Sequence, residues 1–127
     1  MKTAFVTGGT GFIGSRLITL LVERGVRVRA LARSQAGLEK VRALGAEPVL
    51  GDVIDPTPLK EAMRGCDVVF HVASMYEVGL RYKAQMEKVN VDGVRNVIEA
   101  AWEAGVPKIV FTSTIGVFGD TGGQIGR

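Results

Sequence analysis

Eight residues near the N-terminus, Thr7-Gly-Gly-Thr-Gly-Phe-Ile-Gly14, have the spacing of a phosphate-binding turn between a strand and a helix. Gly8 allows a tight turn, Gly11 lets the backbone approach a pyrophosphate, and Gly14 lets the helix lie close to the strand. Free N–H groups and the positive dipole at the helix start then bind the phosphates. The motif predicts a dinucleotide-binding loop whose contacts are Gly8, Thr10, Gly11, Phe12, Ile13 and Gly14.

Arg33 and Ser34 follow the second apolar stretch, where a dinucleotide-binding fold meets the adenosine ribose. A carboxylate there selects NAD, whereas an arginine accommodates the 2′-phosphate of NADP. This chain has no carboxylate at that place, and Arg33 can pair with a phosphate and stack on adenine. Ser34 can donate a hydrogen bond as well. These residues favour NADP over NAD, and the alternative is a surface role for Arg33 at the start of a loop.

Further polar and small residues follow the other expected strands. Asp52 can accept from the adenine amine while Val53 covers the ring, although Asp52 could equally cap a loop. Asn90 shares a helix face with apolar residues, so its amide is expected to point toward the core, either near the nicotinamide or as a brace. The lone His71 is expected to be a packed core residue. The remaining predicted contacts are Val72, Ala73 and Ser74 for the cofactor, and Ser113 and Thr114 for a substrate oxygen.

These residues are positioned by a regular alternation of strands and helices. Apolar stretches predict strands at 3–7, 26–32, 47–50, 67–73 and 108–112. Helices are expected at 12–24, 36–44 and 86–104, with Ile13, Leu17, Leu20 and Leu21 on the buried face of the first. A further helix is expected to begin at Pro56, with Asp55 as its N-cap, and to end before Gly65. The pattern predicts an α/β fold with a parallel, doubly wound sheet.

Composition narrows the class of protein. The chain has 127 residues, 46% of them hydrophobic, a net charge of +3 and one cysteine. No apolar run is long enough to span a membrane, and no basic run with interleaved aromatics indicates nucleic-acid binding. The arginines, including Arg27 and Arg29, are expected to form a solvated surface. We expect one cytoplasmic Rossmann-type domain over residues 1–127, with loop at 116–127 and no metal site.

Taken together, the motifs resemble the extended short-chain dehydrogenase/reductases, the NAD(P)-dependent epimerase/dehydratase family. The resemblance covers essentially the whole chain, through the glycine loop, Gly51-Asp-Val53, the strand at 67–73, the segment Asn90-Val-Asp-Gly-Val-Arg-Asn-Val-Ile98 and the segment from Ser113 to Gly119. His71 to Gly79, with Arg33, is similar to the dihydroflavonol-reductase-like branch, which prefers NADPH.

The resemblance implies roles that the residues alone do not. Thr114, or less directly Ser113, would hold the substrate oxygen, and a Tyr-x-x-x-Lys pair would transfer the proton. Tyr76 and Tyr82 are followed at the fourth position by Leu80 and Met86, so the chain holds no such pair. The family's C-terminal substrate domain is also missing. The chain is therefore expected to bind a dinucleotide without turning over substrate.

Three functions stay open at this point. The first is the cofactor half of a reductase acting on a small carbonyl or alcohol substrate. The second is an epimerase or dehydratase acting on a nucleotide sugar, and the third is a non-catalytic dinucleotide sensor. The resemblance also leaves a homodimer through the long fourth helix open.

Overall fold

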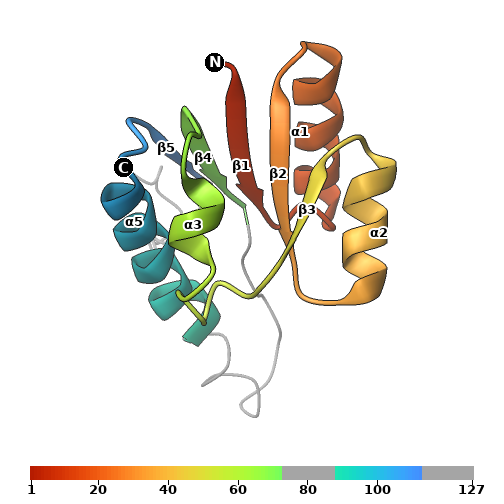
Figure 1. The fold of residues 1–127 in the computed structure, drawn as a ribbon. Coiled ribbons are helices and arrows are strands. Elements are labelled where there is room, and N and C mark those ends of the chain that lie inside the picture. The colour runs from red at the N-terminus through yellow and green to blue at the C-terminus, as the bar shows by residue number, and fades with distance from the viewer. Residues whose placement is uncertain (73–87, 113–127) are drawn as a thin grey trace, which may run out of the picture.

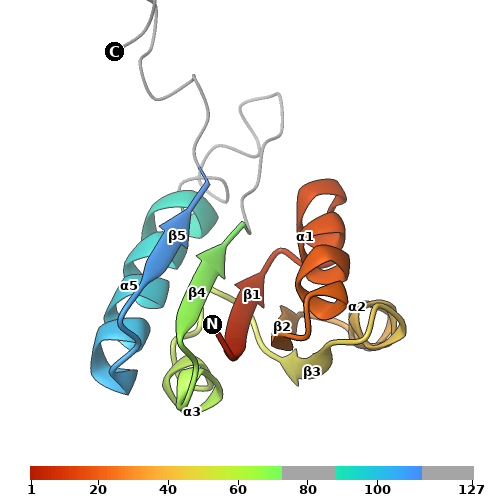
Figure 2. The same cartoon turned by 90° about the horizontal axis from the view of Figure 1, so that it is seen from above.

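A parallel sheet of five strands organises the part of the chain that the structure describes. The computed structural model describes residues 1–72 and 88–112, apart from the side chains of 88 and 89. The sheet has the strand order β3-β2-β1-β4-β5, and each neighbouring pair is parallel (Figures 1 and 2). The strands are β1 (Thr3–Thr7), β2 (Arg27–Ala32), β3 (Glu47–Leu50), β4 (Val68–His71) and β5 (Ile109–Phe111). The predicted α/β doubly wound fold is confirmed.

Helices cover both faces of this sheet. On one face lie α1 (Phe12–Glu23) and α2 (Gln35–Ala43), and on the other lie α3 (Leu59–Met63) and α5 (Gly93–Ala104), as Figure 2 shows. A π-helical turn, η2 (Lys88–Asp92), leads into α5. No helix in the described parts of the chain is long and apolar enough to cross a membrane.

The sheet separates two hydrophobic cores. Phe5 of β1 packs in the core beneath α3 and α5, whereas its neighbours Ala4 and Val6 pack in the core beneath α1 and α2. Alternate residues of a strand point to opposite faces, so a strand covered on both sides must be apolar throughout. This explains why β1, β4 and β5 are mainly apolar in the sequence, whereas β2 carries Arg27 and Arg29 and β3 begins at Glu47.

The expected buried face of α1 is partly wrong. Ile13 and Leu20 are exposed, and the residues that pack on the sheet are Gly14, Ile18 and Leu21, with Leu17 half-buried. The rotation of the helix follows from Gly14, which lies directly against the turn after β1. The helix is therefore turned so that a glycine, rather than a large side chain, faces the loop.

The expected start of the third helix is also wrong. The helix α3 begins at Leu59, after Pro58, instead of at Pro56. The carboxylate of Asp55 accepts the N–H of Thr57 at 3.1 Å and so closes a turn before the helix. Hydrogen bonding to the Thr57 side chain, and then to its backbone N–H, lowers the pKa of the Asp55 carboxyl. An Asp-Pro pair suits a turn as well as a helix start, which is why the sequence pattern was ambiguous.

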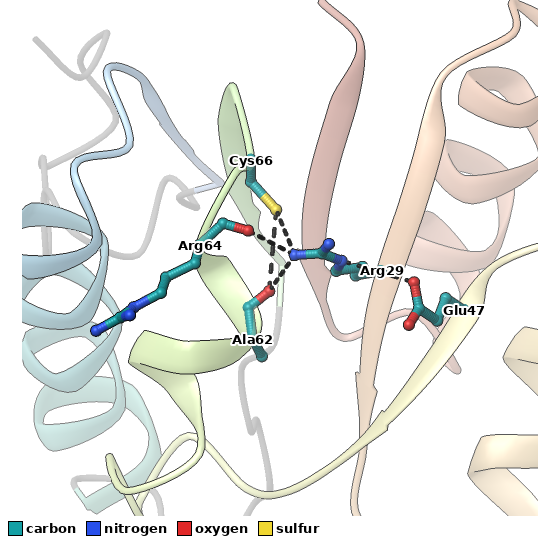
Figure 3. Close-up of polar contacts among 5 residues, drawn as sticks. All are labelled: Arg29, Glu47, Ala62, Arg64 and Cys66. Carbon is teal, nitrogen blue, oxygen red and sulfur yellow. Dashed lines mark hydrogen bonds and ion pairs between the residues drawn. The ribbon is translucent and has the colours of Figure 1, made fainter.

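Arg29 is not a solvated surface residue, contrary to expectation. From β2 it reaches the end of α3, where its Nη1 donates to the carbonyls of Ala62 at 3.1 Å and Arg64 at 2.6 Å (Figure 3). Its Nε lies 3.6 Å from Oε2 of Glu47. A cation at a helix C-terminus satisfies carbonyls that have no intrahelical partner. Arg29 therefore fastens α3 to the sheet.

Cys66 packs beside this guanidinium, with its Sγ 3.8 Å from Nη1 of Arg29. It is buried, and burial raises the pKa of its thiol. Cys66 is therefore a small packing residue of the core beneath α3 and α5.

Candidate dinucleotide-binding site

The glycine loop makes a tight turn at the carboxyl end of β1. Gly8 has a φ of 73°, in the left-handed region that favours glycine. The N–H of Gly11 donates to the carbonyl of Gly8 at 3.1 Å, and the N–H of Ser15 donates to the carbonyl of Gly11 at 2.9 Å. The chain thus turns at Gly8 and enters α1 from Gly11.

Two glycines of this loop differ sharply in their surroundings. A Cβ on Gly14 would lie 1.9 Å from the carbonyl oxygen of Gly8, so α1 can approach the loop only with glycine there. Among the residues that the structure describes, a Cβ on Gly11 would meet only that same oxygen, at 3.5 Å, which is ordinary contact. Gly11 also has an ordinary extended backbone, with φ −83° and ψ 177°. The fold therefore requires glycine at position 14 but does not require it at position 11.

The outer side of the loop is open. Phe12 and Ile13 are 71% and 61% exposed, and the guanidinium carbon of Arg16 lies 4.1 Å from the centre of the Phe12 ring. On the other side, Nζ of Lys40 donates to the carbonyl of Thr10 at 2.6 Å. Lys40 was not predicted as a site residue, and it adds a positive charge from α2 to the edge of the loop.

The ends of β2 and β3 bring Arg33 and Asp52 together. Nη1 of Arg33 lies 4.0 Å from Oδ2 of Asp52, and the two side chains are 69% and 30% exposed. Ser34 is occupied structurally, since its Oγ accepts the N–H of Gly37 at 3.1 Å and caps α2. A hydroxyl that accepts in this way can still donate its own proton.

Val53 is deeply buried. It is 3% exposed and belongs to the core beneath α3 and α5. Its carbonyl accepts from Nδ2 of Asn96 at 2.8 Å, a contact that the sequence analysis missed. The available signal was the polar Asn96 one helical turn after Gly93, next to the buried Val97.

The β4 end of the sheet carries a polar cluster in its interior. Oγ1 of Thr7 accepts the N–H of Val72 at 3.1 Å and lies 2.8 Å from Nδ1 of His71. His71 is buried, which lowers its pKa, and its ring stacks on Phe111 with the centroids 5.7 Å apart. The expectation that His71 is a packed, hydrogen-bonded residue is confirmed.

Asn90 does not point into the core. It is exposed, because η2 changes the helical phase before α5 begins at Gly93. The same phase leaves Ile98 exposed and buries Ala100. The other predicted site residues, Ala73, Ser74, Ser113 and Thr114, lie outside the described residues, as do Tyr76, Tyr82 and the expected loop at 116–127.

The arrangement defines a Rossmann-type unit with a glycine loop at the carboxyl ends of its parallel strands. Comparison with known proteins gives the family: the model of the 3-beta hydroxysteroid dehydrogenase/isomerase family matches residues 5–126. The chain belongs to this family of extended short-chain dehydrogenase/reductases, and the resemblance seen in the sequence is confirmed.

Three relatives show the range of the similarity. A 4-hydroxy-2-methyl-3-oxo-4-farnesyl-3,4-dihydroquinoline-1-oxide ketoreductase of Stigmatella aurantiaca is 44% identical over 120 residues, which are 94% of this chain and 35% of that protein. A short-chain dehydrogenase/reductase superfamily protein from Agrobacterium tumefaciens, solved with bound NAD, is 30% identical with a TM-score of 0.79 (92% and 34% covered). A UDP-glucose-4-epimerase from Stenotrophomonas maltophila, solved with NAD and formylated UDP-arabinopyranose, is 27% identical with a TM-score of 0.82 (95% and 39% covered). The chain thus spans little more than a third of the length of these relatives.

Proposed function

We propose that this chain binds NADP(H) along the carboxyl ends of β1, β2 and β3, as the cofactor half of a reductase. The observation that carries the proposal is the contrast between the glycines. Gly14 is explained by the fold, whereas Gly11 has room for a Cβ inside the protein. A glycine that the fold does not need, at the N-terminus of a helix, is explained by a ligand that must approach the backbone closely.

Charge at the ribose position supports NADP(H) rather than NAD(H). The exposed Arg33 follows β2, where a 2′-phosphate would lie, while Lys40 of α2 adds a cation at the edge of the glycine loop. Asp52 lies 4.0 Å from Arg33 and can hold the guanidinium near this position. A guanidinium binds a phosphate through two parallel N–H donors, which gives both affinity and orientation.

In the complete protein we expect a small carbonyl or alcohol substrate at the β4 and β5 side of the edge. When bound, the nicotinamide would supply or accept a hydride. By the family resemblance Thr114 would hold the substrate oxygen, with Ser113 as the second candidate. The Tyr-x-x-x-Lys pair of the family does not occur in these 127 residues. The chain as given should therefore bind the cofactor without turnover, because a positioned proton-transfer group typically contributes about 10²–10⁴ in rate.

A titration of the chain with NADPH and NADH, followed by fluorescence, tests this proposal. Wild type should bind NADPH more tightly, and Arg33→Ala should weaken NADPH by about 10- to 100-fold, as for the loss of hydrogen bonds to a charged group. The affinity of the same variant for NADH should stay within about twofold. Arg42→Ala, which removes an exposed arginine from α2, is the matched control and should change neither affinity. A wild-type preference for NADH would contradict the assignment.

A second candidate is an epimerase acting on a nucleotide sugar. It is favoured by the structural similarity to the Stenotrophomonas epimerase, which was solved with NAD. The cofactor preference measured in the titration separates the two candidates. The epimerase candidate predicts a preference for NAD(H), and the reductase candidate predicts a preference for NADP(H). The third alternative, a dinucleotide sensor, would be supported if the chain binds NADP(H) and its gene encodes no segment with a Tyr-x-x-x-Lys pair.

A further inference from the structure

The loop after β3 is held from two sides. On the β2 side, the N–H of Gly51 donates to the carbonyl of Ala32 at 3.0 Å and continues the sheet pairing. On the opposite side, Nδ2 of Asn96 donates to the carbonyl of Val53 at 2.8 Å. Asp52 lies between these two attachments. Its position is therefore fixed by the sheet and by α5 together.

At Gly93, helix α5 lies so close to this loop that a residue with a side chain would not fit there. A Cβ on Gly93 would lie 2.7 Å from Cγ2 and 3.3 Å from Cβ of Val53. Gly93 and Asn96 are three residues apart, so they lie on the same face of the helix. Gly93 leaves space for the Val53 side chain, and Asn96 donates to the Val53 carbonyl. Both contacts serve the same residue.

Burial gives this hydrogen bond its importance. Val53 is almost fully buried, while Asn96 is half-buried, so little water can replace the amide donor at the Val53 carbonyl. Leaving a buried carbonyl without a donor is unfavourable, and the loop would relax to find another. Such a movement would carry Asp52, which is adjacent in the chain and whose carboxylate lies near Arg33.

We infer that Asn96 is a positioning residue for the adenine-binding end of the cofactor site. It acts through Val53, whose carbonyl it holds, and so sets the place of Asp52 beneath the adenine. The inference rests on the proposed function, because it concerns the same dinucleotide site. It assigns to α5 a task at the adenosine end of the site, far along the sheet from β5, which follows α5 in the chain.

The test compares ligands with and without adenine. The probes are NADPH and adenosine 2′,5′-bisphosphate, which carry adenine, and reduced nicotinamide mononucleotide, which does not. Asn96→Leu removes the donor at similar size, and it should weaken the two adenine ligands by about 5- to 20-fold while the mononucleotide changes by less than about twofold. Glu99→Leu, at an exposed position one turn further along α5, is the matched control and should change none of the three.

A second variant keeps the test valid if Asn96→Leu folds poorly. Asn96→Asp has the same shape but places a carboxylate against the Val53 carbonyl at neutral pH, so it should also weaken the bisphosphate. Burial and the facing carbonyl oxygen should raise the pKa of this carboxylate above its ordinary value of about 3.9, so protonation restores a donor in part as the pH falls from about 8 to about 5. The affinity for the bisphosphate should then recover in part relative to wild type at the same pH. The mononucleotide is the control here too, because a merely structural loss of stability would weaken both ligands together.

Each outcome has a definite meaning. Unchanged adenine-ligand affinity in a folded Asn96→Leu, or an equal loss for the mononucleotide, overturns the positioning role alone. A wild-type chain that binds neither NADPH nor the bisphosphate overturns the proposed function, and the inference with it. Selective loss for adenine ligands, with pH-dependent recovery in Asn96→Asp, supports both.

Discussion

Replacing Gly11 and Gly14 separately by alanine should separate binding from folding. In Gly14→Ala the new Cβ would lie 1.9 Å from the Gly8 carbonyl oxygen, whereas a close C···O contact is about 3.3 Å. Helix α1 would have to shift by about 1.4 Å, which is overpacking against backbone and costs about 1–3 kcal/mol or more. Alanine gives back about 0.5–1 kcal/mol as the better helix former. We expect a net loss of about 2 kcal/mol, which lowers Tm by about 8 °C in a domain of this size.

Gly11→Ala should behave in the opposite way. Within the described part of the chain its Cβ meets only the Gly8 carbonyl oxygen, at 3.5 Å, so the cost is that of alanine at a helix N-cap, about 0.5–1 kcal/mol. The Cβ would, however, occupy the position expected for the pyrophosphate. Displacing the pyrophosphate should weaken NADPH binding by about 10- to 100-fold.

Thermal unfolding by circular dichroism and fluorescence titration with NADPH measure the two effects on the same samples. Comparing them shows which glycine serves the fold and which serves the ligand. A Gly11→Ala chain that binds NADPH as well as wild type would refute the reasoning from Gly11, and a Gly14→Ala chain as stable as wild type would refute the packing argument.

Two further predictions concern stability. Arg29→Met removes the donors to the carbonyls at the end of α3 and should lower the free energy of unfolding by about 1–3 kcal/mol. The control, Arg27→Met, lies at an exposed position of the same strand and should change this free energy by less than about 0.5 kcal/mol. Denaturant unfolding measures both effects, and equal effects would contradict the prediction. Burial lowers the pKa of His71, so the unfolded chain binds a proton below about pH 6.5 that the folded chain does not, and stability should fall as the pH drops below that value. His71→Gln should lose this part of the pH dependence, and an identical slope in both proteins would show that another group is responsible.

Local signals were sufficient to predict most of the fold. Glycine is a common stop signal after a helix, and the four glycines that follow helix ends, Gly25, Gly45, Gly65 and Gly105, all have positive φ. Strands β1, β4 and β5 were predictable because burial on both faces favours mainly apolar runs. The helix faces were harder, since several leucines and isoleucines compete for the core. In α1 the fit of Gly14 against the Gly8 backbone decided the rotation and left Ile13 in solvent.

The candidate site was predictable from the sequence only where its residues lie close together in one segment of the chain. The glycine loop and the residues that end strands could be found from spacing, because topology brings the carboxyl ends of parallel strands to one edge. The contact of Asn96 with Val53 joins residues 43 apart, and that of Arg29 with Ala62 joins residues 33 apart. Neither partner has a local pattern that selects the other. Such contacts depend on how helices dock on the sheet, which the sequence pattern does not specify.

The order of the strands also determines which way a dinucleotide can lie. From β3 through β2 to β1, the edge carries Asp52, Arg33 and the glycine loop, and β4 and β5 continue beyond them, about 19 Å from one end of the sheet to the other. With the pyrophosphate at the loop and the 2′-phosphate at Arg33, the nicotinamide must extend over β4 and β5. Under the proposed function, the reverse orientation would place the charged 2′-phosphate beside Val72 and Phe111, and would leave the guanidinium facing the nicotinamide, which has no negative charge. Because desolvating a phosphate without a cation is costly, the residues that the structure describes at this edge favour the first orientation. It brings the reacting ring to the end of the sheet that Ser113 and Thr114 follow in the chain.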